Sequence, residues 1–269
     1  MSGTVFLVGA GPGAADLLTL RAARLLGRAD IVFHDALVPQ EILSLVPTQN
    51  RIEVGKRSGR LSTAQAFINK RLADAACKHQ VVVRLKGGDP MLFGRAHEEI
   101  AYLKARRIRV EVVPGVTAAL AAAAESGVSL TRRGVSRSVV FITPRAAAGE
   151  RPNDWVKVAL AAETAAIYMG AGQAAQISRA LIAAGKSPAT PVAVVEKASM
   201  SDARFFAGTL RELEALAVRS SGGPVLILLG EVYREAAASQ IIDAWQSRLS
   251  YSSPTARAMR NGRGRSSSS

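Results

Sequence analysis

VFLVGAGPGA, residues 5–14, joins a short apolar run to a glycine-rich loop. The pattern Gly-x-Gly-x-x-Ala that begins at Gly9 satisfies the loosest form of the dinucleotide-binding fingerprint, and Asp35 ends the next apolar run at a suitable distance. Pro12 argues against this interpretation, because a loop that cradles pyrophosphate uses its backbone N–H groups and proline has none. The fingerprint by itself is therefore weak evidence for an NAD site.

Short apolar runs alternate with amphipathic stretches along the whole chain, which indicates an α/β protein with mainly parallel sheets. The expected strands are residues 5–8, 31–33, 81–85, 110–113, 138–142, 165–169, 192–195, 204–206 and 224–229. The expected helices include residues 16–26, 64–76, 98–105, 117–125 and 174–184. We therefore expect two α/β domains, residues 1–134 and 135–249, with an active-site cleft between them.

The composition limits the class of protein. A chain of 269 residues that is 48% hydrophobic can bury a substantial core. It has no apolar run of the roughly 20 residues that a membrane span needs and no signal-like N-terminus, so we expect a cytoplasmic protein that binds no membrane. Cys77 is the single cysteine, and the three histidines lack ligand spacing, so we expect no metal site.

The formal net charge of +14 implies attraction to an anionic partner, either nucleic acid, a membrane surface or a polycarboxylate. Residues 250–269 carry part of this charge on arginines among serines, a composition typical of a disordered tail. A nucleic-acid-binding protein is a possible interpretation, but aromatic residues make up only 5% of the chain, and single-strand binders use aromatic platforms. We therefore expect no nucleic-acid partner.

Loops rich in Gly, Pro, Asp and Lys follow the first five strands, if a third strand is counted that ends before Val54. They lie at residues 9–13, 34–38, 54–57, 85–90 and 114–118. In an open parallel sheet the ligand lies outside the carboxyl ends of the strands, where these loops meet. Gly87 and Gly88 let a ligand approach the backbone, and Asp89 offers an acceptor for an amine or a hydroxyl. A turn or a helix N-cap is the competing interpretation of Asp89.

Seven motifs follow one another along the chain: VGAGPGAADLLTLRA, VFHDALV, VGKR, VVRLKGGDPMLFGR, VVPGVTAA, IYMG and PVAVVEKAS. In this order and spacing they closely resemble the tetrapyrrole methylase superfamily over about residues 4–233. The resemblance is specific, since RLKGGDP followed by FGR, together with DLLTLRA, is hard to meet by accident. It is closest to the members that methylate uroporphyrinogen III at C2 and C7, which gives precorrin-2 for sirohaem and cobalamin.

The resemblance implies the tetrapyrrole methylase fold, usually as a homodimer, with S-adenosylmethionine in the cleft between the two domains. It assigns to the cofactor site Pro12, Gly87, Gly88, Asp89, Leu92, Thr117, Ala118, Met169 and Ala198. The family often has glycine at the position of Ala198, so a contact there would use the backbone. S-adenosylmethionine carries no phosphate and does not require the N–H group that Pro12 lacks.

Asp35 and Lys56 match positions to which the family assigns proton transfer, Asp35 as acceptor and Lys56 as donor. Transfer of the methyl group to a pyrrole carbon is followed by loss of a proton, for which Asp35 is the candidate general base. A helix cap or an ion pair is the competing role of Asp35. Lys56 with Arg57 is alternatively an anion-binding pair, because lysine acts more often as a point charge than as an acid.

The resemblance gives the basic residues a use, because uroporphyrinogen III is a polycarboxylate. Candidates for its binding are Arg57, Arg95 and Arg132, in a cleft that we expect to be lined also by Lys56, Arg84, Lys86 and Arg133. The chain departs from the family at Ala96-His97, at Arg132 in place of a histidine and at Thr143-Pro144-Arg145. These departures concern the substrate more than the methyl transfer.

Other functions fit parts of the same pattern. A methylase of a later corrinoid or of a diphthamide intermediate is the nearest alternative, and RLKGGDP with the VGKR lysine favours uroporphyrinogen III. A catalytically idle tetrapyrrole carrier is a third interpretation, against which Asp35 and Lys56 argue. The sequence contains no dehydrogenase-like or ferrochelatase-like segment, so we expect a methyltransferase with a single function.

Overall fold

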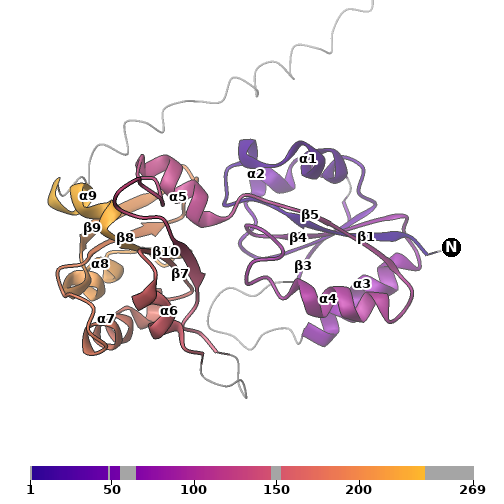
Figure 1. Ribbon diagram of the computed structural model, residues 1–269. Coiled ribbons are helices and arrows are strands. Elements are labelled where there is room, and N and C mark those ends of the chain that lie inside the picture. The colour runs from indigo at the N-terminus through magenta and orange to yellow at the C-terminus, as the bar shows by residue number, and fades with distance from the viewer. Residues whose placement is uncertain (1, 48, 55–64, 147–152, 240–269) are drawn as a thin grey trace, which may run out of the picture.

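The structure, a computed structural model, describes residues 2–47, 49–54, 65–146 and 153–239. Two β-sheets follow each other along the chain, and each is covered by helices on both faces (Figure 1). The predicted tail at residues 250–269 lies outside the described residues. No helix in the described part combines the length and the apolar character needed to cross a membrane.

The first sheet is entirely parallel and has the strand order β3-β2-β4-β1-β5. Its strands are β1 (Thr4–Gly9), β2 (Ile31–His34), β3 (Arg51–Glu53), β4 (Val81–Lys86) and β5 (Arg109–Val113). Val5 of the central β1 pairs with Val82 on one side and Val110 on the other. Parallel strands buried on both faces require apolar runs such as VFLV and VVV, which is why this sheet follows the prediction.

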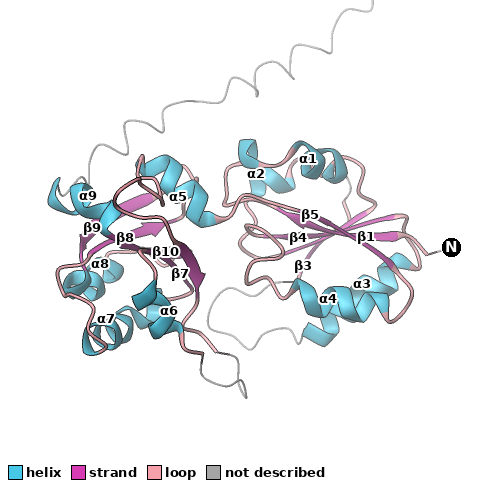
Figure 2. Ribbon diagram, in the orientation of Figure 1, coloured by secondary structure: helices cyan, strands magenta, loops and turns pink. Residues whose placement is uncertain are grey.

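Four helices enclose the first sheet in two layers (Figure 2). They are α1 (Leu20–Leu26), α2 (Gln40–Leu43), α3 (Gln65–Ala76) and α4 (Ala96–Lys104). Alternate residues of the strands face opposite layers, so Leu7 packs with α3 and α4 while Val8 packs with α1 and α2. Because the five strands are parallel, their carboxyl ends all lie at one edge of the sheet.

The first helix is shorter than the sequence pattern predicts. Residues 16–26 were expected as one helix, but α1 begins at Leu20 after a short 3-10 turn over Ala15–Leu17. Thr19 has an extended backbone, and its Oγ accepts a hydrogen bond from Ala22 N at 3.1 Å, which is the geometry of an N-cap. The cap starts a new helix, and the residues before it remain a loop beside the first strand.

The second sheet is mixed, with the order β6-β7-β10-β8-β9. Its strands are β6 (Val139–Ile142), β7 (Thr164–Tyr168), β8 (Pro191–Glu196), β9 (Arg204–Thr209) and β10 (Val225–Gly230). Only β6 and β7 are parallel, because β9 returns beside β8 and β10 inserts antiparallel between β7 and β8. The expectation of a mainly parallel sheet is therefore wrong for this half.

Helices cover both faces of the second sheet. α5 (Ala118–Ser126) and α9 (Arg234–Ser239) pack on one face, and α6 (Trp155–Ala161), α7 (Ala174–Ala183) and α8 (Leu213–Val218) on the other. Ala119 and Ala122 of α5 are fully buried against this sheet, although α5 precedes the predicted domain boundary at residue 134. α5 thus connects the first sheet to the layer that covers the second, and the boundary itself stays a prediction.

Tyr233 lies at the centre of the core between the second sheet and α9. Its side chain is fully buried, and its hydroxyl has no hydrogen-bond partner among the described residues. Burial raises the pKa of this phenol far above its usual value. A buried hydroxyl without a partner destabilises the folded state relative to a phenylalanine of the same shape.

We expect Tyr233→Phe to leave the free energy of unfolding unchanged or to raise it by up to about 1 kcal/mol, because it removes an unpaired polar group. Urea unfolding followed by circular dichroism measures the change. Ser178→Ala is the matched control, since Ser178 Oγ is buried and donates to Leu210 O at 2.6 Å, and its loss should cost about 1 kcal/mol. A Tyr233→Phe variant as destabilised as this control would contradict the prediction.

Candidate functional site

Loops from three strands of the first sheet touch at its carboxyl edge. Gly11 N donates to Gly88 O at 3.2 Å, and Gly88 N donates to Gly11 O at 2.7 Å, so the β1 and β4 loops form a backbone bridge. A Cβ added to Gly115, in the loop after β5, would lie 2.3 Å from Gly88 O. One added to Gly9 would lie 2.6 Å from Gly115 N. Glycine is therefore required for this contact.

Asp89 ties the β4 loop to the β5 loop. Its Oδ1 accepts a hydrogen bond from Met91 N at 2.8 Å, and its Oδ2 accepts one from Gly115 N at 2.9 Å. The turn that competed with ligand binding as an interpretation of Asp89 is thus present. Each carboxylate oxygen keeps a further lone pair, so the turn leaves acceptor capacity for a ligand.

The backbone of Gly87 and Gly88 faces open space. A Cβ added to either residue would meet no heavy atom within 4 Å, and Gly88 has a φ of +65°. Leu92, half-buried, follows in the same loop. A flat ligand can therefore contact this backbone directly, as the sequence predicts for the cofactor.

The second sheet contributes the loop after β8, which contacts the loop after β1. Ala14 N donates to Ser199 Oγ at 2.9 Å, and Ser199 N donates to Glu125 Oε2 of α5 at 2.9 Å. Ala198, 6% exposed, lies in the core beside this contact, and Gly13 is buried against Met200. The structure thus brings Pro12 and Ala198 onto two loops that touch each other.

Tyr168, at the end of β7, holds the start of α5. Its hydroxyl lies 2.6 Å from Thr117 Oγ1 and accepts a hydrogen bond from Ala119 N at 3.2 Å. Its ring lies 5.2 Å from the Phe93 ring and 6.1 Å from the Phe141 ring, centroid to centroid. Three predicted residues, Thr117, Ala118 and Met169, adjoin this aromatic group.

Sequence analysis did not identify the aromatic group formed by Phe93, Phe141 and Tyr168. Phe93 and Phe141 are exposed although large and apolar, at 40% and 38%. Phe93 lies in the motif that follows β4, and Phe141 lies near the end of β6. Aromatic residues are scarce in this chain, which is the signal that could have drawn attention to both. Their ring contacts depend on tertiary structure, since Phe93 follows β4 and Phe141 lies in β6.

Strained backbone marks the same loops. Positive φ values, between 53° and 69°, occur at five non-glycine residues in the loops after β4, β7 and β8: Phe93, Arg95, Met169, Lys197 and Ser199. Such conformations cost free energy and concentrate at functional sites. The loops that carry them are those to which the sequence assigns cofactor residues.

Asp35 follows β2 at this edge and is 30% exposed at its side chain. Arg84 Nη2 donates to its Oδ1 at 2.5 Å, and Gly87 N to its Oδ2 at 3.4 Å. The ion pair that competed with general-base chemistry as an interpretation of Asp35 is therefore present. It keeps the carboxylate beside the open backbone of the β4 loop.

Arg84 and Lys86 were expected to line a basic cleft, and that expectation is wrong for both. They are 3% and 4% exposed, and both donate to Glu99, which is fully buried. Burial, followed by the nearby Arg84 charge, lowers the pKa of Lys86. These two cations therefore neutralise internal carboxylates rather than attract a substrate.

Arg95 and Arg132 are exposed and ion-paired. Arg95 contacts Glu98 with Nε–Oε1 and Nη2–Oε2 distances of 2.7 and 2.8 Å, and its hydrogen bonds lower the pKa of Glu98. Arg132 Nη1 lies 2.9 Å from Glu235 Oε1 of α9. Exposed pairs of this kind contribute little to stability, so an anionic ligand can replace these two carboxylates at small cost.

Two predicted residues, Lys56 and Arg57, lie outside the described residues. Among those that the structure describes, no group of three or more His, Cys, Asp or Glu could hold a metal ion. The groups that these loops offer to a ligand are backbone N–H and C=O groups, the carboxylates of Asp35 and Asp89 and the aromatic group. They suit an organic cation with amino and hydroxyl groups.

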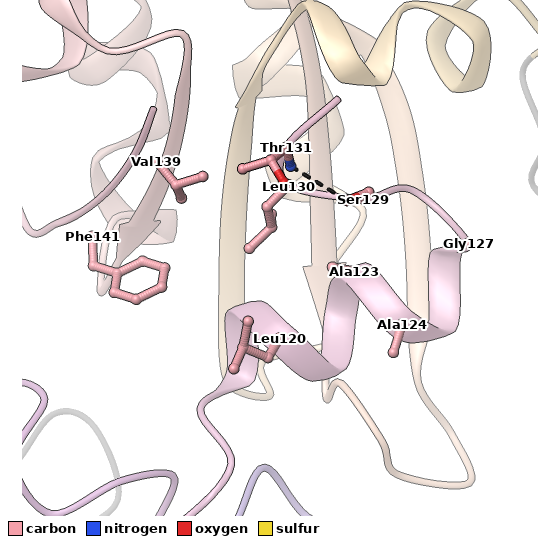
Figure 3. A pocket seen from close by; sticks show the side chains of 9 residues that line it. All are labelled: Leu120, Ala123, Ala124, Gly127, Ser129, Leu130, Thr131, Val139 and Phe141. Atoms are coloured by element: carbon pink, nitrogen blue, oxygen red, sulfur yellow. Dashed lines mark hydrogen bonds between the residues drawn. The ribbon is translucent and has the colours of Figure 1, made fainter. Parts of the chain in front are cut away.

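An apolar groove with a volume of about 580 Å³ lies between α5 and β6 (Figure 3). Leu120, Leu130 and Phe141 point into it from the helix, the following loop and the strand. None of the residues predicted to bind the cofactor lines this groove. Phe141 connects the two regions, because its ring also contacts Tyr168.

Comparisons with known proteins agree with this architecture. A family model described as Tetrapyrrole (Corrin/Porphyrin) Methylases matches residues 4–214. The chain is 46% identical over 231 residues to Siroheme synthase 1 of Cronobacter sakazakii, an alignment that covers 86% of this chain and 49% of that protein. It thus spans about half the length of the curated relatives it matches.

Two solved structures share the fold over nearly their whole length. Uroporphyrin-III C-methyl transferase from Thermus thermophilus, complexed with S-adenyl homocysteine, is 39% identical with a TM-score of 0.76 and covers 87% of this chain and 100% of its own. A cobalt precorrin-4 methyltransferase is 27% identical with a TM-score of 0.72, covering 85% and 95%. They confirm the predicted α/β fold with two sheets.

The partial burial of Glu125 leads to a prediction about how stability depends on pH. Burial raises the pKa of Glu125 above its ordinary value of 4.5, so the folded protein binds more protons than the unfolded chain just above that pH. This component of stability therefore falls as the pH rises. Glu125→Gln removes it, so the stability of the variant relative to the wild type should increase between about pH 4.5 and 7.

Urea unfolding across this pH range tests the prediction. Glu163→Gln is the control of opposite sign, because hydrogen bonds from Arg137 N and from Ser138 lower the pKa of Glu163. The stability of this variant relative to the wild type should decrease as the pH rises toward 4.5 and then stay nearly constant up to pH 7, because a lowered carboxyl pKa changes the number of bound protons only below the ordinary value. A Glu125→Gln difference that is constant with pH would contradict the assignment.

Proposed function

Because the chain belongs to the tetrapyrrole methylase family, we propose that it transfers methyl groups from S-adenosylmethionine to uroporphyrinogen III. The observation that carries the proposal is the match to the entire Thermus thermophilus uroporphyrin-III C-methyl transferase, at 39% identity. The proposed product is precorrin-2, methylated at C2 and C7. The siroheme synthases that match are about twice as long, so only their methylase activity is proposed for this chain.

The residues fit S-adenosylmethionine, which supplies a methyl group on a positively charged sulfur. The open backbone of Gly87 and Gly88 and the remaining acceptor capacity of Asp89 would hold its polar groups. Leu92, Thr117, Ala118 and Met169 would line the site from the loops around Tyr168, and Pro12 and Ala198 from the contact between the two halves. This assignment of residues is part of the proposal.

Asp35 is the proposed general base. Its carboxylate is partly exposed at the edge of the sheet, and the hydrogen bond from Arg84 keeps it oriented. It accepts the proton that the tetrapyrrole loses after methylation. Lys56 is the proposed proton donor, on the strength of its position in the VGKR motif.

Positive charge orients the substrate in this proposal. Arg95 and Arg132 carry exposed guanidinium groups, each in an ion pair with an exposed carboxylate that a polycarboxylate substrate can replace. Arg57 belongs to the same proposed set. The net charge of +14 would steer such an anion toward the protein.

A later corrinoid precursor is the second candidate substrate, favoured by the TM-score of 0.72 to a cobalt precorrin-4 methyltransferase. The corrinoid precursor ranks second because the chain is more similar in sequence to the uroporphyrin-III enzyme, at 39% against 27% identity. A homodimer in the cytoplasm, as inferred from the family resemblance, completes the proposal. Nucleic-acid binding has no support from the described loops.

We expect the protein, incubated anaerobically with uroporphyrinogen III and isotopically labelled S-adenosylmethionine, to give a product heavier by two methyl groups. Mass spectrometry and absorbance measure it. Asp35→Asn should bind S-adenosylhomocysteine normally and lower kcat by about 100-fold or more, since general-base catalysis contributes factors of this size. No methyl incorporation by the wild type would refute the function, and full activity of Asp35→Asn would refute the base.

Gly87→Ala tests the cofactor site separately from stability. The added methyl group meets no protein atom within 4 Å, so the melting temperature should stay unchanged, while a ligand against this backbone should bind at least about 10-fold more weakly. Calorimetric titration with S-adenosylhomocysteine measures the affinity. Gly27→Ala, whose added Cβ makes only ordinary contacts at the end of α1, is the control and should bind normally.

A further inference from the structure

Asp35 is the exposed end of a network of charges that is otherwise buried. Arg84 connects Asp35 to Glu99, and Glu99 also accepts hydrogen bonds from Lys86 Nζ, with both N–O distances at 3.2 Å. The side chains of Arg84, Lys86 and Glu99 are 3%, 5% and 0% exposed, against 30% for Asp35. The network therefore opens to solvent at the edge where the candidate site lies.

Stability alone does not account for this burial. Moving charged groups out of water is costly, and apolar residues of similar volume often stabilise a core as well or better than a buried ion pair. Lys86 illustrates the cost, because burial lowers its pKa. A geometric role at the exposed end would explain why two cations and a carboxylate are retained in this core.

The Arg84 guanidinium has a defined orientation. Nε donates to Glu99 Oε1 at 3.1 Å, Nη1 donates to Leu85 O at 3.1 Å, and Nη2 donates to Asp35 Oδ1. Because the group is planar, two internal acceptors fix the direction in which the third nitrogen points. Glu99 thereby determines where Arg84 holds the Asp35 carboxylate.

We infer that Glu99 is a positioning residue, which acts through Arg84 to hold Asp35 in place for proton removal. The inference rests on the proposed function, in which Asp35 is the base. It assigns a role to a residue that touches neither substrate nor cofactor. The Arg84 guanidinium group transmits this positioning, because it donates to both Glu99 and Asp35.

A purely structural role is the competing explanation. Glu99 Oε1 also accepts a hydrogen bond from Gln65 Nε2 of α3 at 3.1 Å, so Glu99 joins α3 and α4 to the sheet. Glu99→Gln alone would leave two buried cations with one carboxylate and could destabilise the protein for that reason. The double variant Glu99→Gln/Lys86→Met restores the balance of buried charge while leaving Arg84 without an anionic internal partner.

The experiment compares the wild type, the double variant and Arg84→Lys. If Glu99 positions Asp35, the double variant should unfold near the wild-type melting temperature, bind S-adenosylhomocysteine normally and lose about 100-fold in kcat, with KM for S-adenosylmethionine within about twofold. Arg84→Lys keeps the positive charge but lacks the planar guanidinium group with its several N–H donors. It should show the same loss of kcat with little change in KM, even if the double variant folds poorly.

Asp30→Asn is the matched control. Asp30 precedes the same strand that Asp35 follows, and its carboxylate accepts hydrogen bonds from Gln80 N and Val81 N at the amino end of β4. It should lower stability with no change in kcat. Wild-type kcat in both the double variant and Arg84→Lys would overturn the inference, because Glu99 would then be structural only.

Crystal structures of the wild type and the double variant separate this inference from the proposed function. We expect the Arg84–Asp35 contact, 2.5 Å in the wild type, to lengthen or break in the variant. A wild type that methylates no tetrapyrrole would refute the function, whereas the displacement of Asp35 would still be seen. An unchanged contact would overturn the inference whatever the activity.

Discussion

Direct contact between the backbones of three loops is the constraint on which the candidate site depends. The central strand β1 lies between β4 and β5, so the loops that follow these strands emerge side by side. Gly9 and Gly115 let them approach to distances that a Cβ would prevent. The loops therefore present a continuous wall of backbone at the edge of the sheet, with Asp89 tying two of them together.

The second half of the chain completes this wall through a small number of specific contacts. α5 leaves the first sheet and packs on the second, where Tyr168 holds its first turn. Ser199 reaches from the second sheet to Ala14 and is held in turn by Glu125 of α5. Because residues from both halves form the candidate site, its geometry depends on α5 as much as on either sheet.

Charge is divided between the interior and the surface of the first half. Glu99 and Asp35 use Arg84 and Lys86 as internal counter-ions, so these cations contribute little to the field outside. Arg95 and Arg132 face solvent with weak partners and can respond to an anionic ligand. The net charge of the chain cannot distinguish these groups, because it counts buried and exposed cations alike.

The sequence by itself determined the α/β class, the strands of the first sheet and the loops that carry the site, because buried parallel strands and tight turns have local signatures at VFLV, VVV and Gly87-Gly88. Tertiary structure alone decided that β10 enters between β7 and β8, that Arg84 and Lys86 lie inside, and that Phe93 meets Tyr168. These features join residues far apart in the chain. They follow from packing and charge compensation in three dimensions, which local sequence patterns do not reveal.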